Sequence, residues 1–423
     1  MTGRIGMAEI LVRLAWRNVR RQARRSALIA AAMILGLALL VFSRALADGG
    51  HEDWITAGVR LGGGHVAAQN PDFQGSREVA DHLSADELAA VHAAMGEVAG
   101  RDAVAVTDRI SVEALANAAA GAVPVVALGV DPGREASFSP LAPKVMAGRY
   151  LKDGDRLAAF VGKGLAERLH LRVGSRLVLT AQDARGEMTG QFVRVVGIFR
   201  LGIPEVDRGV IHMPIAMAQT WLGIDGATSV NLLLRTSRAT DRVVAGMRRA
   251  LANQPTVAVL PWPRVMPELD AAVRIDDFGF YVFEFILFVI VALAIVNAVL
   301  MSVLYRTREF GILQAMGLTG RQTGALVLIE GTFLTVASGV IGVVVGLAGT
   351  WLFFRHGLDF SFALREQLTA AGIVIEPVIV PMFRMTQVVQ SVTFVVMIGV
   401  FSSLYPAFRA TRIDVALAMK FEA

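Results

Sequence analysis

Residues 305–318, YRTREFGILQAMGL, separate two long apolar runs and decide how the chain is arranged. If both runs cross a membrane, this basic-then-apolar stretch is the only substantial loop on its side of the bilayer. Its apolar residues recur at helical spacing, and Gly317 stands where a left-handed helix end is expected, which predicts a short helix. One interpretation is a helix resting on lipid headgroups. We favour a helix that fits a partner's groove and moves the spans.

The composition indicates a membrane protein. Of 423 residues, 54% are hydrophobic and only 18% are charged, and the apolar excess is concentrated in four blocks. The net charge of +5 does not indicate nucleic acid, because seven arginines lie in the first 25 residues, beside the first apolar block, where positive charge sets orientation. With no cysteine, disulfides and thiolate metal sites are excluded.

The four apolar blocks predict four transmembrane α-helices, with a large α+β domain between the first and the second. Both chain ends and the 305–323 segment carry arginines, which places them in the cytoplasm and the large domain in the periplasm. An A-x-A pattern at 45–47 leaves a cleaved signal peptide as the alternative for the first block. The predicted order is a basic amphipathic helix at 1–25, spans at 26–47, 278–304, 324–354 and 387–405, a periplasmic domain at 48–277, a cytoplasmic helix and loop at 305–323, a periplasmic loop at 355–386 and a cytoplasmic tail at 406–423.

The domain at 48–277 alternates strand-like and helix-like segments. Ser84 and Glu87 have the spacing of a capping box and predict a helix that begins there. Strand, helix, strand patterns occur at both ends of the domain, so we expect its first and last parts to form one subdomain. Residues 120–227 are then a mostly β insertion.

Polar and small residues inside the spans have two interpretations. A stripe of small residues recurs every fourth position in the third span, on which another helix can pack closely: Ser338, Gly342, Gly346 and Thr350. Glu284 and Glu330 are ionisable groups at a costly depth and are functional candidates by default. Each of the two also lies near a membrane face, where a bond to a neighbouring helix explains it better than a proton relay.

Catalytic motifs are missing from the sequence. The fragment Gly162-Lys163-Gly164 lacks the spacing and the hydroxyl of a phosphate-binding loop, so we expect this chain not to hydrolyse ATP. The seven histidines lack metal-ligand spacing, and no serine lies in a nucleophile elbow. We therefore expect neither a catalytic residue nor a metal site, and no enzyme activity of its own.

Three segments resemble a known family: YRTREFGILQAMGLTGRQ, beginning at Tyr305, the terminal YPAFRATRIDVALAMK, and VGKGLAERLHLRVGSRLVLTA at 161–181. They look like the FtsX-like permeases of type VII ABC transporters, which include lipoprotein-releasing and MacB-type proteins of the bacterial inner membrane. The resemblance implies porter-like and sabre-like subdomains, a second permease subunit in a homodimer or heterodimer, and a separate ATPase subunit that binds ATP and Mg. It also implies a coupling helix that docks on that ATPase, through Arg306, Arg308, Glu309, Phe310, Gly311, Ile312, Leu313, Met316 and Gly317.

The resemblance leaves three functions open. A lipoprotein-releasing permease would admit acyl chains between the first two spans and extrude lipoprotein towards a periplasmic carrier. The candidate residues for that lipid cavity are Met33, Leu37, Val41, Phe283 and Leu287. A MacB-like permease would transmit motion to periplasmic substrates instead, and an FtsX-like regulator would signal to a cell-wall hydrolase.

Overall fold

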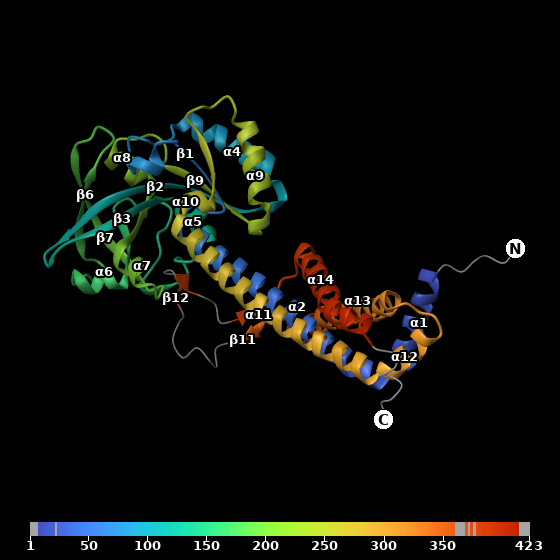
Figure 1. Ribbon diagram of the computed structural model, residues 1–423. Helices are drawn as coiled ribbons and strands as arrows, with labels where there is room; N and C mark the ends of the chain where they lie inside the picture. Colours follow the sequence, from blue (N-terminus) through green and yellow to red (C-terminus); the bar gives the residue numbers. More distant parts are fainter. Residues whose placement is uncertain (1–6, 22, 360–368, 371–372, 375–377, 414–423) are drawn as a thin grey trace. The chain divides into compact units, whose positions relative to one another are not determined.

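The computed structural model describes residues 7–21, 23–359, 369–370, 373–374 and 378–413 (Figure 1). Parts of the segments predicted at 1–25, 355–386 and 406–423 lie outside these residues. The chain divides into two compact units. The helical unit comprises Met1–Gly50, Asp276–Asp359 and Val378–Ala423, and the lobe comprises His51–Ile275 with Phe360–Pro377.

Four long apolar helices in the described chain can cross a membrane by length and composition, which confirms the four predicted spans. They are α2 (Ala23–Leu61), α11 (Pro267–Tyr305), α13 (Gly320–Phe354) and α14 (Met385–Thr411). Two shorter helices belong to the same unit, α1 (Met7–Arg21) and α12 (Thr307–Ala315). The described part of the loop after α13 contains short strands: β11 (Leu358–Asp359), β12 (Thr369–Ala370), β13 (Ile373–Val374) and β14 (Val378–Ile379), in which β11 pairs with β14 and β12 with β13.

Helices α2 and α11 extend past the apolar runs that predicted them. The apolar runs suggested an end near 47 and a start near 278, whereas the helices end at Leu61 and begin at Pro267. The extra turns carry apolar residues at helical spacing, and these pack together in the lobe: Ile55, Val59, Leu269 and Val273 share a cluster with Trp262. A helix needs no lipid to form its backbone hydrogen bonds. Packing within the lobe therefore extends each helix beyond its hydrophobic run.

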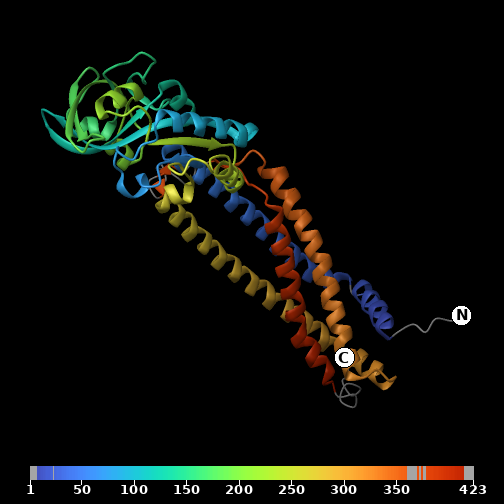
Figure 2. The same ribbon diagram turned by 90° about the horizontal axis from the view of Figure 1, so that it is seen from above.

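Small residues let the helices of the bundle approach closely. Helices α13 and α14 lie side by side (Figure 2), and a Cβ on Gly331 would overlap the Ser403 side chain. On α13, Gly342 and Gly346 face α2, where a Cβ on Gly346 would lie 3.0 Å from the Cα of Ala38. Ser338 and Thr350 of the same stripe are also buried.

The lobe is built on one sheet with the strand order β10-β1-β9-β2-β3-β8-β5-β7-β4, in which β6 pairs with both β2 and β7. The circuit β2-β3-β8-β5-β7-β6 therefore closes on itself, as in a small barrel. The strands are β1 (Val66–Gln69), β2 (Ala103–Ala118), β3 (Gly121–Val130), β4 (Val145–Gly148), β5 (Ala158–Gly162), β6 (Arg176–Gln182), β7 (Met188–Phe199), β8 (Val210–Pro214), β9 (Ser229–Leu234) and β10 (Ala258–Pro261).

Helices cover the sheet and cap its ends. They are α3 (Phe73–Ser76), α4 (Ala85–Ala99), α5 (Pro132–Phe138), α6 (Lys163–Arg168), α7 (Pro204–Gly209), α8 (Ile215–Leu222), α9 (Thr240–Ala250) and α10 (Trp262–Val265), with 3-10 turns η1 (Gly100–Asp102) and η2 (Ser237–Ala239). The predicted capping box is confirmed, because the Ser84 hydroxyl accepts from the Glu87 N–H and the Glu87 carboxylate accepts from the Ser84 N–H.

The lobe has two main apolar cores. One joins α4 and α9 to the strands β1, β9 and β10, and it draws on the first and last parts of the lobe. The other fills the closed circuit of strands and includes Ile110, Leu177 and Val193. Strand β2 takes part in both, since its first half pairs with β9 and its second half with β6. The two subdomains therefore share one continuous strand.

Candidate functional site

The candidate site is α12, which is separated from α11 by a break at Arg306. The backbone leaves helical geometry there, at φ −105° and ψ 12°. Arg306 is 5% exposed, and its guanidinium donates from Nη1 to Glu330 Oε2 at 2.6 Å and from Nε to Glu309 Oε2 at 2.9 Å. The guanidinium carbon also lies 4.9 Å from the centre of the Phe310 ring. The break is therefore held by a buried charge on α13.

Glu330 joins three separate elements. Besides accepting from Arg306, its other oxygen accepts from the Asn18 amide of α1 at 2.7 Å. The interpretation that Glu330 bonds a neighbouring helix is thus confirmed by these contacts. Charge-assisted hydrogen bonds between buried partners are short and directional, so the cluster fixes how α1 and α12 lie against α13.

The inner side of α12 is held by an apolar core. Phe310 is 1% exposed and packs in a cluster that draws on all six helices of the unit: Leu11, Ala15, Met33, Ile295, Val299, Val303, Phe310, Leu326, Val327, Ala407 and Ala410. Truncating a buried phenylalanine typically costs about 3–5 kcal/mol, so this contact is a large share of what seats the helix. Helix α12 is therefore attached to the bundle along one whole side.

The C-terminal end of α12 has the predicted glycine stop. Gly317 has φ +106°, and its N–H donates to Gln314 O at 3.0 Å while the Leu318 N–H donates to Leu313 O at 3.1 Å. This pair of bonds is a Schellman motif, which glycine permits because it carries no Cβ. Thr319 then caps α13 with Gln322 in a second capping box. The turn between α12 and α13 is fixed by local sequence.

The structure divides the nine predicted coupling residues between two sides of α12. Arg306, Phe310 and Gly311 are buried, and Leu313 is partly buried. The other five are exposed, together with the neighbouring Ala315: Arg308, Glu309, Ile312, Met316 and Gly317. Phe310, Leu313 and Met316 recur every third residue in the sequence, but Phe310 points into the bundle while Met316 is 69% exposed. The exposed residues form one side of the helix, which we call the outer strip.

The five predicted lipid-cavity residues lie in different surroundings. Met33, Leu37 and Val41 are buried, and Leu37 and Val41 pack against the glycines of α13. Leu287 is half-buried beside the Leu37 cluster, whereas Phe283 is 45% exposed. In this chain Leu37 and Val41 serve helix packing, and Phe283 is the exposed member. A lipid-binding role for the five stays a prediction.

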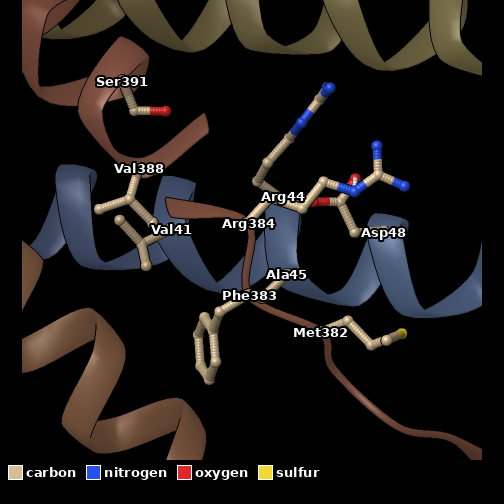
Figure 3. Close-up of a pocket in the computed structure, with 9 residues that line it drawn as sticks. All are labelled: Val41, Arg44, Ala45, Asp48, Met382, Phe383, Arg384, Val388 and Ser391. Atoms are coloured by element: carbon tan, nitrogen blue, oxygen red, sulfur yellow. Dashed lines mark ion pairs between the residues drawn. The ribbon is translucent and has the colours of Figure 1, made fainter. Parts of the chain in front are cut away.

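A small hollow lies between α2 and the start of α14 (Figure 3). Arg384 approaches Asp48 with 3.8 Å between Nε and Oδ1, and the Met382 N–H donates to Ala45 O at 2.8 Å. The hollow has a volume of about 10 Å³, on the order of a single water. It is a packing junction and not a lipid site.

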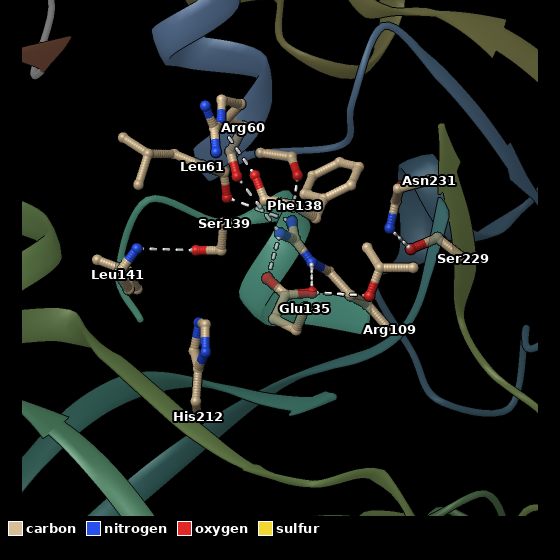
Figure 4. A network of polar contacts seen from close by, with 12 residues as sticks. Arg60, Leu61, Arg109, Glu135, Phe138, Ser139, Leu141, His212, Ser229 and Asn231 are labelled. Atoms are coloured by element: carbon tan, nitrogen blue, oxygen red, sulfur yellow. Dashed lines mark hydrogen bonds and ion pairs between the residues drawn. The ribbon is translucent and has the colours of Figure 1, made fainter. Parts of the chain in front are cut away.

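A buried ionic network in the lobe was not predicted from the sequence (Figure 4). Arg109 of β2 pairs with Glu135 of α5 at 2.6 Å, and its guanidinium also donates to the carbonyls of Arg60, Leu61 and Gly62 at the end of α2. Burial alone would raise the pKa of Glu135, but the charge and hydrogen bonds of Arg109 lower it below its ordinary value. Arg109 thereby caps the negative end of the α2 dipole.

Four apolar helices, a lobe between the first two and a seated helix between the second and third define a membrane permease subunit. Family models agree over nearly the whole chain: residues 26–250 match the MacB-like periplasmic core domain, and residues 281–415 match the FtsX-like permease C-terminal domain. The chain belongs to the FtsX-like permeases with a MacB-like periplasmic core.

Its relatives are ABC transporter permeases. LolC of Xylella fastidiosa, a lipoprotein-releasing system transmembrane protein, is 24% identical over 306 residues, 71% of this chain and 73% of LolC. YknZ of Bacillus subtilis, an uncharacterized ABC transporter permease, is 24% identical over 290 residues, 66% of each chain. MacB of Chlorobium phaeobacteroides, a macrolide export ATP-binding/permease protein, is 31% identical over 130 residues, 30% of this chain and 16% of MacB.

Membership of this family identifies the class of transporter subunit. It is an ABC transporter permease of the LolC, MacB and FtsX type, and its apolar helices and periplasmic-type domain fit an inner-membrane protein. The family implies an ATPase partner and another permease subunit.

Proposed function

We propose that this chain is the permease subunit of a lipoprotein-releasing ABC transporter. A separate ATPase would bind ATP and Mg and dock on the outer strip of α12. A permease dimer would then extrude lipoprotein from the outer leaflet of the inner membrane towards a periplasmic carrier. The observation that carries the proposal is that α12 presents Arg308, Ile312 and Met316 outward while its inner side is fixed to the bundle.

The positive charge at the chain's start and around α12 supports a cytoplasmic position for both termini and for the docking surface. Exposed apolar residues beside charged ones are typical of a docking surface whose centre is desolvated. The seated α12 supplies the mechanical half of the proposal. Because α12 is fixed to the bundle, a force on the outer strip would be transmitted through Phe310 and Arg306 to α13 and α11. A flexible loop at this position would absorb such a displacement.

Docking is tested by co-purification of the chain with its ATPase. Ile312→Asp and Met316→Asp place charges in the centre of the outer strip, so we expect co-purification and stimulated ATP turnover to fall at least tenfold. Reversing the charge at Glu309 tests the contribution of charge on the same helix. Replacing Gly311 with a bulky residue tests the packing of that helix. Arg321→Ala, exposed at the start of α13, is the matched control. Unchanged co-purification in both Asp variants would remove the docking assignment.

The cargo is tested separately by photocrosslinking. A benzoylphenylalanine at Phe283, exposed on α11, should label palmitate-tagged lipoprotein, and one at Phe353, exposed on α13, should not. Equal labelling at the two sites during ATP turnover would count against lipid entry beside α11.

A MacB-like mechanotransmission role is the second candidate. Arg109 and Glu135 tie the carbonyl end of α2 to the sheet of the lobe, so a displacement of α2 would reach β2 directly. This reading predicts a periplasmic partner on the lobe and no labelled lipoprotein at Phe283.

A further inference from the structure

A groove on the lobe lies apart from α12, where the proposed function places docking. It has a volume of about 290 Å³ and is lined by strands β1, β2, β3, β8 and β9, by α3, by the end of α2 with the two glycines that follow it, and by Val265 and Met266. This is close to the lower end of the range for ligand pockets, roughly 300–1,000 Å³. A second hollow of about 230 Å³ adjoins it, and the two share Arg77 and Glu113. The two hollows are therefore neighbours on the lobe.

One residue that lines the groove, Asn231, has a buried hydrogen-bond acceptor that receives no hydrogen bond in the described chain. Asn231 is 1% exposed, and its Nδ2 donates to the Ser229 hydroxyl at 3.1 Å (Figure 4). Its Oδ1 is buried and has no partner in the described chain. A buried amide oxygen left unpaired is costly, so this position favours a ligand that brings an N–H or O–H group.

The groove does not favour an anion. Arg109 lies in its wall, but its guanidinium has five N–H donors and five contacts. Those contacts are the two oxygens of Glu135 and the carbonyls of Arg60, Leu61 and Gly62. The two shared residues, Arg77 and Glu113, carry opposite charges, and the second hollow adds the acidic Glu78 and Asp183, which disfavour an anion further. The lining also mixes apolar residues, among them Phe73, Leu128, Val210 and Met266, with neutral polar ones, namely Gln69, Gln74, Ser111 and Ser229.

The strand beneath the groove has an open edge. Strand β2 pairs with β9 as far as Arg109 and with β6 from Leu115 onward. In the described chain, residues 110–114 therefore pair with another strand, β3, on one side only. On the open side the Ser111 N–H is taken by the Thr228 hydroxyl at 2.9 Å, and Glu113 lies in both hollows. An open strand edge is a template for an extended chain.

We propose that this groove binds an extended, uncharged polypeptide segment, with a backbone N–H donated to Asn231 Oδ1 and apolar side chains against Phe73 and Met266. A polypeptide combines amide donors, small apolar side chains and an extended shape, which are the three properties that the groove requires. The proposal does not depend on docking at α12, so either can fail while the other holds.

The test is binding of a synthetic peptide to the full-length chain in nanodiscs without ATP. The probe is an acetylated, amidated six-residue peptide of alanine, valine and serine with a neutral fluorophore. We expect saturable binding that Asn231→Leu weakens about tenfold, because a buried N–H would lose its acceptor. Asn117→Leu, on the same sheet but outside both hollows, should change the affinity less than twofold.

A peptide N-methylated at its central amides repeats the test without altering the protein, which covers the case that Asn231→Leu fails to fold. It should also bind about tenfold more weakly. Absence of saturable binding, or equal binding of the N-methylated and unmethylated peptides, would show that water satisfies Asn231 and overturn the proposal. Crosslinking in cells from benzoylphenylalanine at Phe73 distinguishes the sources: a cargo segment leaves on ATP turnover, and a resident partner's segment stays.

Discussion

The Arg306 guanidinium and the Glu330 carboxylate lie 2.6 Å apart, joining the break between α11 and α12 to the inside of α13. Both side chains are largely buried; Asn18 also donates to Glu330, and Arg306 also donates to Glu309. A buried ion pair adds little net stability over apolar residues of the same volume, but removing one member leaves a charge without compensation. The pair therefore serves best to specify how α12 is seated.

We expect Glu330→Leu to destabilise the protein by about 3 kcal/mol, because Arg306 would remain buried and charged with only the exposed Glu309 as an ion partner. The double variant Arg306→Met with Glu330→Leu should recover most of that loss. Thermal unfolding in detergent and hydrogen exchange of the α12 amides measure both effects. Single-variant losses that simply add in the double variant would contradict a coupled pair.

We expect Gly346→Val to separate α2 from α13, since its Cβ would lie about as close to the Ala38 backbone as atoms can pack. Overpacking of this kind costs roughly 1–3 kcal/mol. Gly349→Val is the matched control, because a Cβ at Gly349 meets nothing within 4 Å. Chemical unfolding of the two variants should differ; equal losses would mean that helix propensity and not packing sets the cost.

We expect Arg109→Lys to destabilise the lobe by about 2 kcal/mol or more, because three ammonium donors cannot replace five guanidinium contacts. Arg134→Lys alters an exposed arginine that pairs with Asp108, and should cost less than about 1 kcal/mol. Unfolding monitored by the tryptophans of the lobe compares the two. If the lobe were equally stable in the two variants, Arg109 would not stabilise it by capping α2.

We expect the lobe to lose stability as the pH falls from about 6.5 to about 4. Burial lowers the pKa of His65 and of His212 to about 4, while the unfolded chain takes up these protons near pH 6.5. The stability is therefore full above pH 6.5 and falls by up to about 3 kcal/mol for each histidine by pH 4. His212→Leu should flatten the slope of unfolding free energy against pH, and the exposed His170→Asn should not. An unchanged slope in His212→Leu would show that other groups titrate.

The outer strip of α12 shows where prediction from sequence stops. The short helix and its glycine stop follow from neighbouring residues and were predicted from local pattern; the Thr319 cap was not predicted, although it also depends on neighbouring residues. The side of α12 that faces outward depends on where Phe310 finds its core, and that core is assembled from helices hundreds of residues apart. Ile312 and Met316 look no different from Phe310 in the sequence.

The lobe shows the same division. The capping box at Ser84 and Glu87 spans four residues and was predictable, whereas Arg109 meets Glu135 and the end of α2 only after β2 and α5 are in place. The groove at Asn231 had no signal at all in the sequence, because its walls come from five strands.

The sequence by itself determined the four spans, the position of the lobe between the first two and the helix between the second and third. Hydrophobic length and helix capping depend on residues within a few turns of one another. They can therefore be recognised without knowledge of the tertiary structure. The tertiary structure alone decided which charges are buried in pairs, which glycines meet α2 and which face of α12 stays open. Those outcomes depend on contacts between segments that are far apart in the sequence. No local pattern identifies which segments will make such contacts.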